Sequence, residues 1–142
     1  MDQVTERIES LKAGLAGAAA ATSAFGLAAT GRLWLSLGLD LGLDLAPATA
    51  LGSQATVALL SGFLFGVTYR YVIRADRNSH LQSGAVLAFG LVRGLAPIQS
   101  LRLDWQAALQ IGLQLTESLL LFSLAALLID WLMRRGWIQR FS

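Results

Sequence analysis

The sequence predicts an all-α integral membrane bundle of four transmembrane helices, with both termini on the cytoplasmic or stromal side. Three observations lead to this prediction. The 142 residues are 55% hydrophobic and only 14% charged, with a mean hydropathy of +0.58, which is too apolar for an ordinary soluble domain. Four apolar windows approach the roughly 20 residues that a helix needs to cross about 30 Å of hydrocarbon. Basic residues gather at alternate ends of these windows. We treat residues 1–142 as a single membrane domain.

The four windows are apolar stretches bounded by charged residues. They cover about residues 13–31, 48–73, 81–98 and 105–133. The first is rich in Ala and Gly and lies between Lys12 and Arg32. The third is the shortest and carries Arg93 near its end, whereas the fourth is most apolar in its second half.

The positions of basic residues predict the orientation, because positive flanks resist translocation across the membrane. With four spans, eight basic residues lie on one side, against Arg32 and Arg102 on the other. The eight are Arg7, Lys12, Arg70, Arg74, Arg77, Arg134, Arg135 and Arg140. Trp34 and Trp105 fall at the outer ends of their spans, as interfacial aromatic side chains should. Both termini are therefore expected on the cytoplasmic or stromal face.

The segment between the first two windows has a period of two. Leucine occupies every odd position from 33 to 45, with Asp40 and Asp44 on alternate positions. An extended chain would place all of these leucines on one face, whereas a helix would scatter them around its cylinder. We expect residues 33–45 to form an extended strip on the outer membrane surface. The alternative is that the first helix continues to about Leu39.

Small residues recur at helical spacing in the windows. Gly62 and Gly66 form a GxxxG motif in the second window, and Gly90 and Gly94 form one in the third. In lipid such residues let helices approach closely. The motifs indicate either packing within the monomer, which we prefer, or a face for a homo-oligomer or another membrane protein.

Polar residues within the windows are candidate functional groups, because ionisable side chains in a bilayer are costly. Gln106, Gln110, Gln114 and Glu117 form a stripe along the outer half of the fourth window. Arg93 lies roughly 6 Å deep and Glu117 roughly 18 Å deep at the helical rise, so no direct salt bridge between them is expected. Arg93 is expected to reach the outer headgroups or to meet Asp104 or Gln106.

Glu117 has two interpretations. A desolvated carboxyl group can exchange a proton near neutral pH, which would suit a proton- or substrate-handling face. The stripe can instead hold helices together, with Glu117 protonated or bonded to a hydroxyl group such as that of Thr22, Ser61 or Ser83. We prefer the second interpretation, because a single acidic site is little for a transporter.

The stretch from the end of the second window into the following loop is the densest polar part of the sequence. It contains two tyrosines and three arginines, namely Tyr69, Arg70, Tyr71, Arg74 and Arg77. These residues are candidates for binding an acidic partner or anionic lipid headgroups. The alternative is that the loop only sets topology.

The composition excludes several kinds of chemistry. There is no cysteine and only one histidine, His80, so thiol chemistry and a structural zinc site are excluded. No nucleophile–base pair or phosphate-binding glycine loop can be assembled. We therefore expect no enzyme activity, no cofactor, no metal and no nucleic-acid partner.

From about Gly62 to Pro97, including TYRYVIRADRNSHLQSGAVLAFGLVRGLAP, the chain resembles small multi-pass membrane proteins of cyanobacteria and chloroplasts. The resemblance implies a thylakoid or plasma-membrane location, with the basic loop on the cytoplasmic or stromal side. It brings no catalytic or pigment-binding motif.

These observations favour an assembly, scaffold or accessory subunit of a larger membrane complex, such as a photosynthetic one, with lipid and other membrane proteins or further copies as partners. The alternative is a small proton-coupled transporter or channel subunit that uses Glu117.

Overall fold

The computed structural model describes residues 3–39, 48–73, 79–96 and 105–139. Over these residues the chain is all-α, as predicted, and forms four helices. They are α1 (Gln3–Leu39), α2 (Ala48–Val72), α3 (Ser79–Leu95) and α4 (Trp105–Arg134). In the described part of the chain, α1, α2 and α4 are long and apolar enough to cross a membrane.

The third helix is shorter than the other three. Its 17 residues span about 25 Å at the helical rise, against about 30 Å of hydrocarbon. By length and composition, three of the four predicted spans, α1, α2 and α4, are long and apolar enough to cross a membrane.

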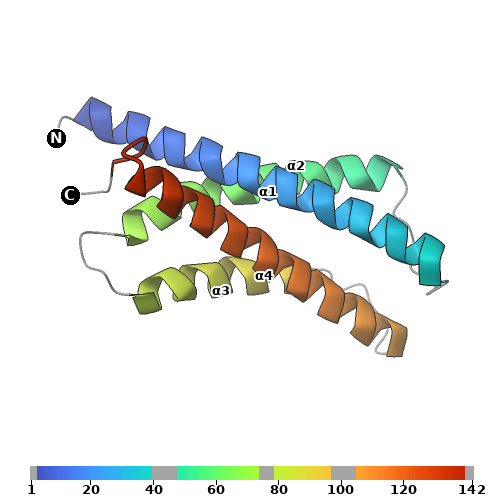
Figure 1. The fold of residues 1–142 in the computed structure, drawn as a ribbon. Coiled ribbons are helices and arrows are strands. Elements are labelled where there is room, and N and C mark those ends of the chain that lie inside the picture. Colours follow the sequence, from blue (N-terminus) through green and yellow to red (C-terminus); the bar gives the residue numbers. More distant parts are fainter. Residues whose placement is uncertain (1–2, 40–47, 74–78, 97–104, 140–142) are drawn as a thin grey trace.

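Neighbouring helices alternate in direction (Figure 1). Helix α1 packs chiefly on α2, α3 packs on α4, and α1 also crosses α4. The start of α1 and the end of α4 lie at the same end of the structure, together with the end of α2 and the start of α3. We call this the terminal end and the other the distal end.

An aromatic cluster joins three helices at the centre of the bundle. The ring of Phe65 on α2 lies 5.1 Å from Tyr69, 5.3 Å from Phe89 on α3 and 5.0 Å from Phe122 on α4, measured between centroids. Phe65 and Phe122 are fully buried. Such stacked, tilted and edge-on pairs add to the stabilisation from burial.

The glycines of both GxxxG motifs lie at contacts between helices of the same chain. A Cβ added to Gly62 would lie 2.6 Å from the carbonyl oxygen of Gly17, and one added to Gly66 would lie 3.1 Å from Cα of Gly14. The missing side chains let the backbones of α1 and α2 touch.

The second motif acts at the α3–α4 contact. Added Cβ atoms on Gly90 and Gly94 would lie 2.6 Å from Leu119 and 2.8 Å from Leu115 of α4. All four motif glycines thus face a helix of their own chain.

The extended strip predicted from residue 33 is wrong over residues 33–39, because α1 continues as a helix to Leu39. The alternative that the first helix runs on is the one the structure shows. Leu33, Leu35 and Leu37 are all exposed, on different sides of the helix. Leucine is a strong helix former, and a helix with apolar surroundings needs no polar face, so a period of two does not exclude it. Residues 40–45 lie outside the described residues.

Large apolar side chains cover the outside of the bundle. Each helix exposes several of them, including Leu15 and Leu27 on α1, Leu60 and Leu64 on α2, Leu87 and Val92 on α3, and Leu120 and Leu127 on α4. A surface of this kind in a folded chain marks contact with lipid or with other proteins.

A glycine with positive φ ends α4. Gly136 has φ of 76°, its N–H donates to the carbonyl of Met133, and the N–H of Trp137 donates to that of Leu132. This pair of bonds is a Schellman motif, in which glycine avoids the strain of a left-handed backbone. It turns the chain back toward α1.

Candidate functional site

A buried arginine joins three segments at the terminal end. Arg70 of α2 is fully buried. Its Nε donates to the carbonyl of Gln139 at 2.9 Å, and its NH1 donates to the carbonyl of Glu6 at 3.1 Å and to Oγ of Ser10 at 2.6 Å. We call these four residues the Arg70 network. It ties the start of α1 and the chain after α4 to the end of α2.

A second buried charge supports this network. The carboxylate of Glu9 accepts hydrogen bonds from Lys12 Nζ at 2.8 Å and from the backbone N–H of Gln139 at 2.8 Å. Gln139 is therefore held through both of its backbone polar groups, by Arg70 and by Glu9.

These contacts alter our interpretation of the basic aromatic loop. Tyr69 is buried and its hydroxyl donates to Asp130 at 3.3 Å. Tyr71 is exposed, and its hydroxyl accepts a 3.3 Å hydrogen bond from Ser10. Of our two interpretations, a binding surface or a loop that only sets topology, the first would need accessible side chains, whereas Tyr69 and Arg70 lie on the inner side of α2. Arg74 and Arg77 lie outside the described residues.

An ion pair links α1 and α4 toward the distal end. Arg32 donates from Nε and from NH2 to the two carboxylate oxygens of Glu117, the second bond being 2.7 Å long. About a third of each side chain is exposed, 35% for Arg32 and 31% for Glu117. A fork of this kind fixes both the distance and the orientation of the two groups. It gives Glu117 a cationic partner that the hydroxyl groups considered from the sequence do not provide.

Arg93 of α3 lies at the same level as this pair. Gly90 and Gly94 contact Leu119 and Leu115, which are the neighbours of Glu117 by two positions on either side. The charge of Glu117 acts on Arg93 electrostatically. Arg93 donates to Oγ of Ser61 at 3.3 Å, whereas the carboxylate oxygens of Glu117 bind Arg32.

The side chains of the glutamine stripe of α4 become more buried along the helix. Gln106 is exposed and Gln110 is partly buried. Gln114 has a buried Oε1 that accepts no hydrogen bond from the described residues. Only the inner half of the stripe therefore lies against other helices.

Sequence reasoning missed the role of Arg32, which it assigned to the outer flank of the first helix. The sequence did contain a signal for this ion pair, because a carboxylate as deep in the membrane as Glu117 needs a cation on a neighbouring helix. Ser10, Glu6 and Gln139 were missed as well. Two of these contribute backbone carbonyl groups to Arg70, and such contacts leave no mark on the sequence.

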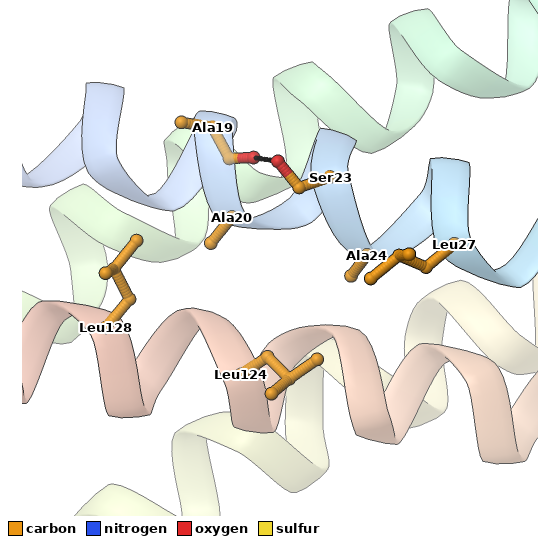
Figure 2. Close-up of a pocket in the computed structure, with 7 residues that line it drawn as sticks. All are labelled: Ala19, Ala20, Ser23, Ala24, Leu27, Leu124 and Leu128. Carbon is orange, nitrogen blue, oxygen red and sulfur yellow. Dashed lines mark hydrogen bonds between the residues drawn. The ribbon is translucent and has the colours of Figure 1, made fainter.

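A groove of about 290 Å³ runs between α1 and α4 (Figure 2). Its lining is almost entirely apolar and consists of Ala19, Ala20, Ser23, Ala24, Leu27, Leu124 and Leu128. The hydroxyl of Ser23 donates to the carbonyl of Ala19 on its own helix. The groove thus lacks the convergent polar groups that orient a small polar ligand.

Within the four described segments, no group of three or more His, Cys, Asp or Glu side chains is placed to hold a metal ion. The polar residues that lie together there include those of the Arg70 network and of the Arg32–Glu117 pair.

Comparison of the chain with protein-family models, with curated proteins and with solved structures finds no match.

Proposed function

We propose that the chain is an integral membrane protein of four spans, with both termini on the cytoplasmic or stromal face, and that it is a non-enzymatic assembly, scaffold or accessory subunit of a larger membrane complex. The three long apolar helices support insertion. The start of α1 and the end of α4 lie at one end of the structure, which supports an even number of spans. The fourth span is α3, whose 17 residues fit if its ends lie in the headgroup region.

One observation carries the scaffold role. The side chains that bind one another inside the bundle, such as Arg70 with Ser10 and Arg32 with Glu117, join helices, while large apolar side chains face outward on every helix. This distribution provides interfaces rather than reacting groups. The resemblance of residues 62–97 is our ground for a thylakoid or plasma-membrane location, with a photosynthetic complex as one candidate partner.

Site-specific photo-crosslinking in native membranes tests this proposal. A crosslinking residue is placed at outward positions Leu64 or Leu127, with buried Phe122 as the matched control. We expect a discrete adduct with another polypeptide, recovered after gentle solubilisation, from an outward position only. Adducts with lipid alone at every position would contradict a scaffold role, and release of the chain by alkaline washing would contradict membrane insertion.

The alternative is a small proton-coupled transporter or channel subunit that uses Glu117. The bidentate bond from Arg32 weakens this alternative, because it engages both carboxylate oxygens of Glu117 in a contact between helices. A transporter predicts that Glu117→Gln abolishes a pH-dependent flux in proteoliposomes and leaves expression intact. Loss of the folded protein instead supports a role in holding helices together.

A further inference from the structure

The groove between α1 and α4 has an apolar lining with no polar group left to satisfy. On α1 it is lined by small side chains and Leu27, and on α4 by Leu124 and Leu128 (Figure 2). The hydroxyl of Ser23 donates to a carbonyl of its own helix. Atoms that line an empty space lose van der Waals contacts, so a groove of about 290 Å³ with this lining suits an apolar occupant.

The α4 side of the groove continues to a tryptophan and an arginine at the terminal end. Four side chains follow at spacings of four, three and four residues and so share one face of the helix, namely Leu124, Leu128, Trp131 and Arg135. The backbone N–H of Arg135 donates to the carbonyl of Trp131 at 3.0 Å, so helical hydrogen bonding reaches Arg135. Trp131 is exposed, and the guanidinium carbon of Arg135 lies 4.3 Å from the centroid of its ring. The apolar groove therefore leads to a cation.

The charge of Arg135 is available to a partner outside the described chain. Lys12 of α1 lies at the same end of the groove, eight residues before Ala20. Its Nζ binds Glu9 at 2.8 Å, so its charge is compensated. Arg135 is exposed and makes no ion pair or side-chain hydrogen bond with the described residues. An arginine beside an interfacial tryptophan attracts anionic lipid headgroups.

The distance from Arg135 to the groove matches the depth of one leaflet. Leu128 is seven residues and Leu124 eleven residues before Arg135, which is about 10 and 16 Å at the helical rise. Half of the hydrocarbon thickness is about 15 Å. An acyl chain that begins at the level of Arg135 can therefore pass Trp131 and fill the groove without leaving its own leaflet.

We propose that the α1–α4 groove, together with Trp131 and Arg135, binds one anionic phospholipid. Its phosphate lies on Arg135, because guanidinium groups bind phosphate oxygens in a planar, two-pronged geometry. One of its acyl chains lies between α1 and α4. In the orientation proposed above, the terminal end faces the leaflet that carries anionic lipid. The inference rests on the membrane insertion of the proposed function and does not depend on the scaffold role.

Native mass spectrometry tests the headgroup contact. The purified chain is titrated in detergent with phosphatidylglycerol or with phosphatidylcholine of the same acyl chains. We expect one molecule of phosphatidylglycerol to bind in a saturable manner and about fivefold more tightly than phosphatidylcholine, since a basic residue near an anionic lipid contributes about 1 kcal/mol. Arg135→Gln should remove this preference. Arg134→Gln is the matched control, because this exposed arginine lies about 100° around the helix from Arg135.

A second pair of variants tests the acyl-chain contact. Ser23 and Ser53 are both exposed, and both bind a carbonyl of their own helix, but only Ser23 lines the groove. Ser23→Phe fills the groove and should weaken the binding of both lipids, whereas Ser53→Phe should bind them as the native chain does. Phosphatidylglycerol with a photoreactive acyl chain should label the native chain within residues 19–27 and 124–128.

Several results would overturn the lipid site. They are equal binding of the two lipids, an equal loss of affinity in Arg134→Gln and Arg135→Gln, or labelling outside the groove. A dimer that Ser23→Phe dissociates would also overturn it, because a second copy of the chain would then occupy the groove. Each of these results leaves membrane insertion intact. Release of the chain from membranes by alkaline washing would instead contradict the proposed function.

Discussion

Arg32 of α1 binds both carboxylate oxygens of Glu117 of α4, across 85 positions of the sequence. The pair fixes the register of two antiparallel helices, and near the terminal end Glu9 of α1 also binds Gln139, in the chain that follows α4. Two polar contacts at different heights define a single alignment of α1 against α4. Apolar packing in lipid discriminates less sharply between neighbouring registers, so charged contacts are the natural means of specifying one.

A double-mutant cycle on Arg32 and Glu117 measures the strength of this pair. We expect Arg32→Gln and Glu117→Gln each to lower the free energy of unfolding, and the double variant to lose less than the sum of the two. The expected coupling is about 1 kcal/mol, toward the low end for contacting charges because a third of each side chain is exposed. Unfolding in mixed micelles measures the four free energies. Strictly additive losses would show that the pair contributes no net stability.

Two glycines of α2 form a matched pair for testing the α1–α2 contact. A Cβ on Gly66 would press on the backbone of Ala13 and Gly14, whereas a Cβ on Gly52 would meet no atom within 4 Å. We expect Gly66→Ala to destabilise the chain by about 2 kcal/mol through overpacking. Gly52→Ala should be neutral or stabilising by up to about 1 kcal/mol, because alanine is the better helix former. Equal effects in micelle unfolding would be evidence against the close contact.

Helix boundaries were the most predictable part of the structure. The second and fourth windows, 48–73 and 105–133, differ from α2 (Ala48–Val72) and α4 (Trp105–Arg134) by a single residue at one end. Apolar length and basic ends determine such boundaries locally. The end of the first helix was missed, because alternating leucines are compatible with a strand in water and with a helix in an apolar environment.

The contacts of the candidate site were less predictable than the helices. Glu117 and Arg93 stood out because each is an ionisable group within an apolar window. Their partners depend on how helices cross, which sequence periodicity does not encode. Depth along the helices separated Arg93 from Glu117, whereas the structure places the two at the same level. It also placed Arg32 at the outer flank and so overlooked the cation that binds Glu117.

Removing the Arg70 side chain is expected to release the chain after α4. Arg70→Met keeps most of the apolar volume but removes the charged donor of the Gln139 carbonyl, whereas the Glu6 carbonyl keeps the hydroxyl of Ser10. A hydrogen bond to a charged group contributes roughly 1.5–3 kcal/mol, so we expect a total loss of about 3 kcal/mol. Hydrogen exchange at the Gln139 amide should become faster. Arg134→Gln, at an exposed arginine of α4 at the same end of the bundle, is the control and should leave that amide protected.

The turn at Gly136 is expected to be sensitive to any side chain. Its φ of 76° is strained for an L residue, so Gly136→Ala should cost about 1 kcal/mol. Gly112→Ala on the same helix is the control, because a Cβ there meets nothing within 4 Å and should be tolerated. Since the turn directs Gln139 toward Glu9 and Arg70, the Gly136 variant should also expose the C-terminal residues to limited proteolysis. Unchanged cleavage would mean that the turn does not position them.

Cysteine labelling tests the four-span topology, and in particular whether the short helix α3 crosses the membrane. The chain has no cysteine, so single variants are read without background. His80 and Trp137 are exposed at the terminal end, and Trp34 and Trp105 are exposed toward the distal end. We expect a membrane-impermeant thiol reagent to reach His80→Cys and Trp137→Cys from the cytoplasmic or stromal side, and Trp34→Cys and Trp105→Cys from the other.

Helices α3 and α4 separate His80 from Trp137, so both positions lie on one face of the membrane only if α3 spans it. Labelling of His80→Cys and Trp137→Cys from opposite faces would leave α4 as the only crossing between them and would exclude the four-span arrangement. Labelling of all four variants after solubilisation controls for burial of the thiol.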